Sequence, residues 1–229
     1  MKSFNRIILM LVVLIITMLS ITPPSRADEP NQAGPKIFLP LIIKAQSSLV
    51  NGNFESGNTG WAVSSTHNLT VITQSFAPNS ATVHGGSWGA WLGGQNSELT
   101  SLQQEITIAA NSPYLAYWHW IGSNDICGYD KATILINNTS IHEHNLCSTT
   151  NTNGWVKQVV NLSSYAGQTV TLRLQAQNDS SFNSNFFLDD VAFQGAATLT
   201  SNEIAEMERN TVKRAGTETD GNNYDWLKP

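Results

Sequence analysis

Three carboxylates stand out because they occupy segments in which an acid needs a partner. Glu55 lies in a turn-like segment rich in asparagine and glycine, residues 50–57, and Asp189 and Asp190 lie among aromatic and β-branched residues in 185–193. Acids are poor strand formers and are costly to bury without compensation. Carboxylate and carbonyl oxygens from both ends of a domain are ligands that suit Ca²⁺. We expect these segments to be the first and last strands of one domain, latched by calcium.

Side chains suited to catalysis are present, but their surroundings argue against an enzyme. Residues 85–89 match the nucleophile motif G-x-S-x-G, which works at a strand–turn–helix elbow, and no helix is expected here. His142 and His144 face one side of a strand, without a third metal ligand nearby. A glycosidase needs two facing carboxylates, whereas Asp189 and Asp190 are expected to diverge across their strand. We predict no catalytic residues, and a hydrolase is the weakest alternative.

Tryptophans supply the remaining candidate binding residues. In residues 114–121 both faces are apolar, as in a central strand, with Trp118 and Trp120 sharing one of them. These two, together with Trp61 and Trp155, are the candidates for stacking on sugar rings, whose apolar faces cover an indole while amides bond the hydroxyls. Packing in the core is the alternative for each of the four.

Period-two alternation with frequent turn signals runs from residue 49 to residue 193, and no helical periodicity interrupts it. This pattern predicts an all-β chain folded as a sandwich. The expected strands are 61–64, 69–74, 88–92, 99–108, 114–121, 132–136, 140–144, 156–162, 169–177 and 186–193.

The chain divides into four parts. Residues 1–27 combine a basic start, an apolar run and a small-residue site, which predicts a secretory signal peptide cleaved after Ala27. The apolar run is short for a membrane span of about 20 residues, so a retained anchor is the lesser alternative. Residues 28–47 form a linker with an apolar, proline-containing spacer, and residues 48–195 form the sandwich. We therefore expect a secreted, extracellular protein of bacterial type, with no membrane span after cleavage.

After the sandwich, residues 196–229 change in character. Thr200 and Glu203 are spaced as a capping box, which predicts a short helix that continues to about Arg214. A polar, glycine-containing tail follows.

The cysteine and charge content indicates a disulfide and limits the classes of partner that the chain can bind. Cys127 and Cys147 are the two cysteines of the chain, and in an oxidising compartment they predict a disulfide worth about 3 kcal/mol. Between residues 48 and 195 the basic residues are limited to Lys131, Lys157 and Arg173. A surface this poor in basic side chains cannot neutralise a phosphate backbone, so nucleic acid is excluded as a partner.

Three stretches resemble jelly-roll accessory domains of secreted bacterial proteins, of the MAM-like and carbohydrate-binding-module type that accompanies peptidases. They are residues 51–57 with Trp61, residues 86–93, and residues 188–191. The resemblance implies a jelly-roll β-sandwich with a structural Ca²⁺. Its ligands would be the side chains of Glu55 and Asp189 and the carbonyls of Asn53 and of Ser87 or Trp88.

The leading hypothesis is a secreted, non-catalytic module that binds an extracellular ligand, either a glycan or a protein surface. The alternative is an adhesion, structural or peptidase-accessory domain. The sequence identifies neither the ligand nor the oligomeric state.

Overall fold

The computed structural model describes residues 48–76 and 81–217, with side chains to Asn210. The predicted signal peptide at 1–27, the spacer at 28–47 and the tail beyond 217 lie outside the described residues. Among the described residues, no helix has the length and apolar character that crossing a bilayer requires.

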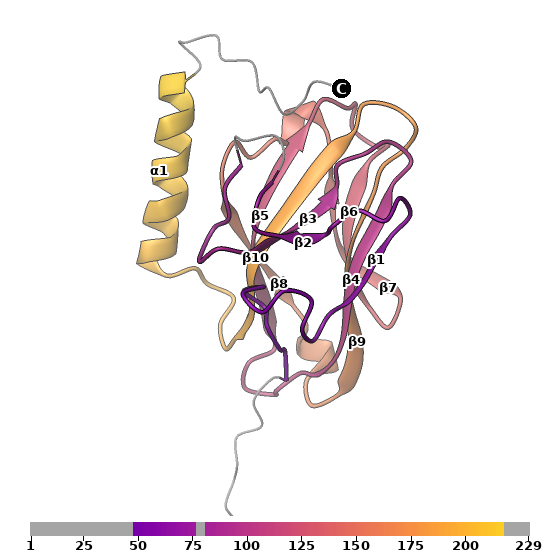
Figure 1. Cartoon of the computed structure of the whole chain (residues 1–229). Coiled ribbons are helices and arrows are strands. Elements are labelled where there is room, and N and C mark those ends of the chain that lie inside the picture. The colour runs from indigo at the N-terminus through magenta and orange to yellow at the C-terminus, as the bar shows by residue number, and fades with distance from the viewer. Residues whose placement is uncertain (1–47, 77–80, 218–229) are drawn as a thin grey trace, which may run out of the picture. The chain divides into compact units, whose positions relative to one another are not determined.

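Two antiparallel sheets of five strands each form the domain, which confirms the predicted jelly-roll β-sandwich (Figure 1). The first sheet has the strand order β1-β4-β9-β6-β7, and the second has the order β2-β3-β10-β5-β8. All ten expected strands are present, with ends shifted by a few residues. Their bounds are β1 Ala62–Ser65, β2 Ile72–Thr73, β3 Gly89–Gly93, β4 Leu99–Thr107, β5 Tyr114–Ser123, β6 Lys131–Ile136, β7 Thr139–Asn145, β8 Val156–Asn161, β9 Thr169–Gln177 and β10 Ser184–Gln194.

The core fills the space between the sheets and explains the alternation in the sequence. In β4, β6 and β9 every second residue is buried and the intervening ones are partly or fully exposed, as expected for strands with one face in a core. The two central strands of the second sheet, β5 and β10, are buried on both faces. Their outward side chains join a second apolar cluster, described below.

The segment expected to be the first strand, residues 50–57, is instead a series of turns. Asn51 and Phe54 have positive φ angles of 52° and 57°, which regular strand geometry does not accommodate. Phe54 is nevertheless fully buried, and its ring centroid lies 5.7 Å from that of Trp61. The segment therefore closes one end of the core as a packed loop, and the first strand begins at Ala62.

Two further predictions are confirmed. Cys127 and Cys147 form a disulfide, which ties the loop after β5 to the end of β7. The helix α1, Ser201–Thr217, begins with the predicted capping box. The amide of Glu203 donates to Thr200 Oγ1 at 3.3 Å, and the amide of Thr200 donates to Glu203 Oε2 at 2.6 Å. The helix continues three residues past the expected end.

Candidate functional site

Residues 84–88, just before β3, are held by both ends of the sandwich. From the N-terminal end, Glu55 Oε1 accepts hydrogen bonds from the amides of Ser87 and Trp88, each at 2.8 Å. The loop passes very close to this carboxylate, since a Cβ on Gly86 would lie 2.2 Å from Glu55 Oε1. Glycine is required here for this reason and because its φ is +61°.

From the C-terminal end, Asp189 holds the same loop. It is fully buried, and its Oδ2 accepts hydrogen bonds from the amides of His84 at 2.9 Å and Gly85 at 3.1 Å. Nearby, the amide of Val191 donates to the carbonyl of Gly52 at 2.8 Å. Thus the two ends of the sandwich lie side by side, as the sequence predicts.

The expectation that Asp189 and Asp190 diverge across the sheet is wrong. The register of β10 against β5 shifts between Asp189 and Ala192, and Asp190 has a φ of 47°, so a β-bulge interrupts the alternation. As a result Asp190 Oδ2 reaches His84 Nδ1 at 2.7 Å, while Asp189 binds the backbone of the same residue. Both acids act on one loop.

The contacts of Glu55 and Asp189 decide how well calcium fits between them. Asp189 uses Oδ2 for two amides and Oδ1 for the amide of Asp190 at 2.7 Å. Glu55 likewise accepts two amides through Oε1. A cation would compete with these donors. Glu55 and Asp189 are therefore arranged as carboxylates that accept hydrogen bonds from backbone amides rather than as metal ligands. Calcium bound by Glu55, Asp189 and the carbonyls of Asn53 and Trp88 stays a prediction.

Titration of these groups follows their surroundings. Burial raises the pKa of Asp189 to about 6, although the amides of Gly85, Asp190 and His84 favour its charged form. Burial lowers the pKa of His84, but the hydrogen bond to Asp190 and the charge of Glu206 outweigh it, so the net shift is upward. His84 therefore carries positive charge more readily than an ordinary histidine.

An aromatic surface covers the outer face of the second sheet. Its buried members are Phe76, Trp118, Trp155 and Phe187 with Ala81, and Val83, Trp91, Trp120 and Met207 pack against them. Phe187 of β10 lies directly opposite Trp91 of β3 and Trp120 of β5. Three aromatic side chains on adjacent strands therefore form one row, Trp91–Phe187–Trp120, in which the two tryptophans are partly exposed.

The four tryptophans singled out in the sequence have different environments. Trp61 is 5% exposed and belongs to the core between the sheets, so it presents no face to a ligand. Trp118 and Trp155 lie on the outer aromatic surface but are only 5% and 6% exposed. Trp120 is partly exposed on that surface. Trp91 was missed, although its position between the core residues Ala90 and Leu92 already signals an outward side chain.

Helix α1 lies against this aromatic surface. Glu203 forms an ion pair with Lys157 of β8, and Glu206 Oε1 lies 3.1 Å from His84 Nε2. Met207 packs against the aromatic cluster, and Asn210 Nδ2 donates to the carbonyl of Trp155 at 2.9 Å. Beneath the helix, the His84 ring stacks on Trp118 with centroids 4.1 Å apart. The helix thus covers the Trp118 end of the surface.

Among the described residues, the other side chains considered for catalysis or metal binding do not form a site. Ser87 lies in the loop before β3, and a strand follows it rather than a helix. His119, His142 and His144 have neighbouring ring centroids 4.5 and 4.7 Å apart, and burial lowers the pKa of all three, that of His144 to about 4. Within the described ranges, these histidines are not part of a group with metal-ligand spacing.

Glu98, which immediately precedes β4, is 1% exposed. Its Oε1 accepts from the hydroxyl of Ser65 at 2.7 Å and the amide of Thr66 at 2.9 Å, and its Oε2 accepts from the amide of His67 at 3.1 Å. These hydrogen bonds stabilise the turn after β1, so the role of Glu98 is structural.

No protein-family model matches the chain, and no curated protein matches it in sequence. Several solved structures resemble it in fold. TmCBM61 in complex with β-1,4-galactotriose is 16% identical, covers 66% of this chain and 100% of its own, and gives a TM-score of 0.48. The K3 cleaved adhesin domain of Lys-gingipain from Porphyromonas gingivalis W83 is 15% identical over 64% and 98% of the two chains, with a TM-score of 0.44. A family 16 carbohydrate-binding module is 21% identical over 63% and 96%, with a TM-score of 0.39. Likenesses this weak do not identify what this chain binds.

Proposed function

We propose that this chain is an exported, non-catalytic binding module that binds an extracellular glycan on the outer face of its second sheet. The observation that carries the proposal is the row Trp91–Phe187–Trp120. Two partly exposed indoles flank a buried phenyl ring, directly opposite it on adjacent strands. Indoles presented side by side on a rigid sheet suit the apolar faces of successive sugar rings.

Polar groups beside the row add to its suitability. Trp91 Nε1 donates to Asn185 Oδ1 at 2.8 Å, and Asn185 Nδ2 donates to the carbonyl of Gly122 at 3.2 Å. These bonds fix the Trp91 indole before any ligand arrives, which reduces the entropy lost on binding. The Trp120 end differs, because Trp120 Nε1 is buried without a hydrogen-bond partner among the described residues.

The test is a glycan array followed by isothermal titration with any sugar that binds. Trp91→Ala and Trp120→Ala are each expected to weaken binding about tenfold, equivalent to about 1.4 kcal/mol. Tyr129→Ala is the matched control, because Tyr129 is an exposed aromatic residue (61%) in the loop between β5 and β6. A blank array, or tryptophan variants that bind as tightly as the unmodified protein, would contradict the proposal.

One observation favours the alternative, an interaction module that binds a protein surface. Ile126, Tyr129 and Phe182 are 69%, 61% and 62% exposed, and they lie on the two loops β5–β6 and β9–β10. Exposed apolar side chains at this density indicate a contact surface. If that function holds, Tyr129→Ala and Phe182→Ala reduce partner binding or self-association in light scattering, while Trp91→Ala has no effect.

A further inference from the structure

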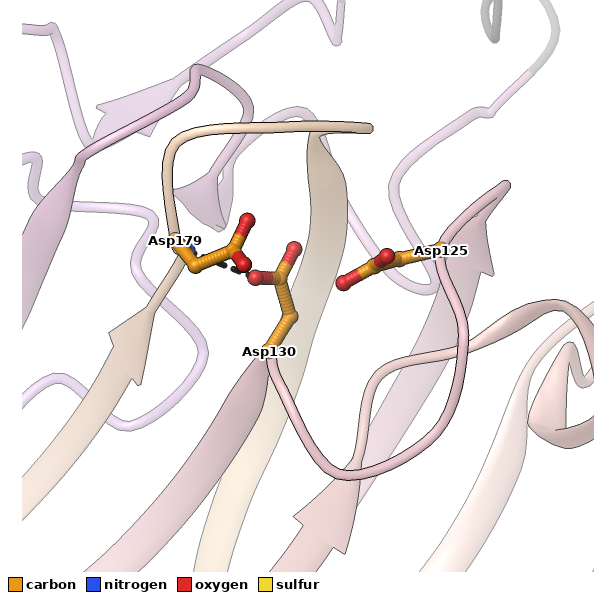
Figure 2. Close-up of side chains that lie close together, drawn as sticks. All are labelled: Asp125, Asp130 and Asp179. Atoms are coloured by element: carbon orange, nitrogen blue, oxygen red, sulfur yellow. Dashed lines mark hydrogen bonds between the residues drawn. The ribbon is translucent and has the colours of Figure 1, made fainter.

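The loops β5–β6 and β9–β10 bring together three aspartates that the proposed function does not use. Asp125 and Asp130 flank Cys127 in the first loop, and Asp179 lies in the second loop, two residues after the end of β9. One carboxylate oxygen from each can be chosen so that all three atoms lie within 4.8 Å of one another. Figure 2 shows the three carboxylates turned toward a common space, with Asp130 in the middle.

The hydrogen bonds of these acids leave part of the cluster unsatisfied. Asp130 Oδ1 accepts the amide of Asp179 at 2.7 Å, and Asp125 Oδ1 accepts the amide of Ile126 at 2.7 Å. The other oxygen of each, Asp125 Oδ2 and Asp130 Oδ2, is buried without a hydrogen bond of good geometry among the described residues. The side chain of Ser184 approaches Asp130, but its hydroxyl is bonded to Ser123 and the carbonyl of Leu146. Asp125 is 3% exposed and Asp130 is fully buried. Two unpaired buried carboxylate oxygens beside a third acid are costly unless something positive binds them.

No basic side chain within the described part of the chain forms an ion pair with any of the three. Lys131 is adjacent to Asp130 in sequence, but its ammonium group pairs with Glu143 at 3.0 Å. Backbone amides therefore bond to these acids, but no described side chain supplies them with a positive charge.

We propose that Asp125, Asp130 and Asp179 form a binding site for Ca²⁺. The donors are all hard oxygens, which suit Ca²⁺ better than zinc or copper, because protein sites for those metals are richer in nitrogen and sulfur. Two ligands at the usual distance of about 2.4 Å from Ca²⁺ lie at most about 4.8 Å apart, so the three oxygens can share one ion. Water or main-chain carbonyls would supply the remaining positions. Mg²⁺ fits less well, because it requires a rigid octahedron and keeps most of its water.

Such an ion would add a second link between two loops that already share the hydrogen bond from the amide of Asp179 to Asp130. The disulfide fixes the β5–β6 loop to the end of β7, and the cation would fix the same loop to Asp179. Ile126, Tyr129 and Phe182, the exposed apolar residues of these loops, would then be held in one arrangement. Calcium at this site would therefore organise the apolar end of the sandwich.

The test is titration of the chelator-treated protein with CaCl₂ and, separately, MgCl₂, followed by calorimetry and by the midpoint of thermal unfolding. Saturating calcium is expected to raise the midpoint by about 5 °C or more, with a smaller effect of magnesium. Asp130→Asn and Asp179→Asn should each abolish most of the shift. In chelator, the same variants should melt no lower than the unmodified protein, because they remove like-charge repulsion.

Glu55→Gln is the matched control, because it changes a carboxylate in the other acidic region and should leave the calcium shift intact. Asp179 is less buried than Asp130, so Asp179→Asn decides the question if Asp130→Asn does not fold. The proposal is overturned if calcium leaves the unfolding midpoint unchanged. It is equally overturned if Asp179→Asn keeps the full shift while Glu55→Gln loses it, since calcium would then bind at the opposite acidic region.

Discussion

Two acidic regions of this sandwich solve the problem of buried carboxylates in different ways. At the loop 84–88, Asp189 directs its oxygens at three backbone amides, and its charge is spread over hydrogen bonds. At the loops near the disulfide, Asp125 and Asp130 each leave one buried oxygen unpaired. Hydrogen bonds account for both oxygens of Asp189, whereas the second region leaves two oxygens available to the Ca²⁺ ion that we propose. Burial of an acid is thus no guide to metal binding until its hydrogen bonds are counted.

The largest effect is expected from Asp189→Ala. Removal of the carboxylate leaves the amides of His84, Gly85 and Asp190 without their acceptor, which should cost about 4 kcal/mol of the free energy of unfolding. Urea unfolding in chelator and in calcium should give the same loss. A loss that is several kcal/mol larger in calcium would show that Asp189 is a metal ligand and would erase the distinction between the regions.

The disulfide belongs to the second region, and its removal tests whether that region depends on preorganised loops. Replacement of Cys127 and Cys147 by serine opens a link with a sequence separation of 20, and it should lower the free energy of unfolding by about 3 kcal/mol. Calcium affinity should fall several-fold in the same variant, because the Asp125–Asp130 loop loses its tie. Unchanged affinity, measured by calorimetry, would mean that the acids are positioned without the disulfide.

A buried histidine outside both acidic regions, His144, also contributes to the pH dependence of stability. Burial, aided by the charge of His142, lowers the pKa of His144 to about 4 in the folded protein, against about 6.5 when unfolded. The folded state therefore binds fewer protons. The contribution of His144 to the free energy of unfolding is complete above pH 6.5 and is lost as the pH drops toward 4. The loss at pH 5 is about 2 kcal/mol. Denaturant unfolding of His144→Gln at pH 7 and 5 should show a smaller acid loss, and an equal loss would place the titrating group elsewhere.

Glu55→Gln should have the smallest effect. Its side chain is exposed, and a glutamine oxygen can still accept from the amides of Ser87 and Trp88, so the cost should be about 1 kcal/mol or less. Chemical denaturation with and without calcium measures it. A large destabilisation that appears only with calcium would argue for the latch that the family resemblance implies.

The strands were predictable where one face meets the core and the other meets water. β4, β6 and β9 show this alternation, and β9 was located to the residue. The capping box at Thr200 and the cysteine pair were equally readable, because each is a local pattern with one dominant physical cause. The turn at residues 50–57 was mistaken for a strand, since Asn51 and Phe54 adopt left-handed angles that an apolar–polar pattern does not reveal.

The aspartate cluster was beyond the reach of sequence reasoning. Asp130 immediately precedes β6 and Asp179 follows β9, and they meet because these strands pair with Lys131 opposite Gln177. Periodicity identifies strands but not their order in a sheet, so this proximity required the fold. For the same reason His84 passed unnoticed: it gains its partners from β10 and α1, both more than 100 residues away along the chain.

The β-bulge at Asp190 has a consequence for any change in the length of β10. One extra residue at this point shifts the inward and outward alternation of the side chains by one position. Phe186 and Leu188 face the core before it, and Val191 and Phe193 face the core after it, so even positions hand over to odd ones. Loss of the one extra residue would leave a regular strand with Val191 and Phe193 still facing the core, whereas a strand of the same length paired without the bulge would turn both outward and Ala192 inward. The bulge therefore lets β10 carry one more residue than β5 opposite it while the apolar side chains on both sides of Asp190 stay in the core.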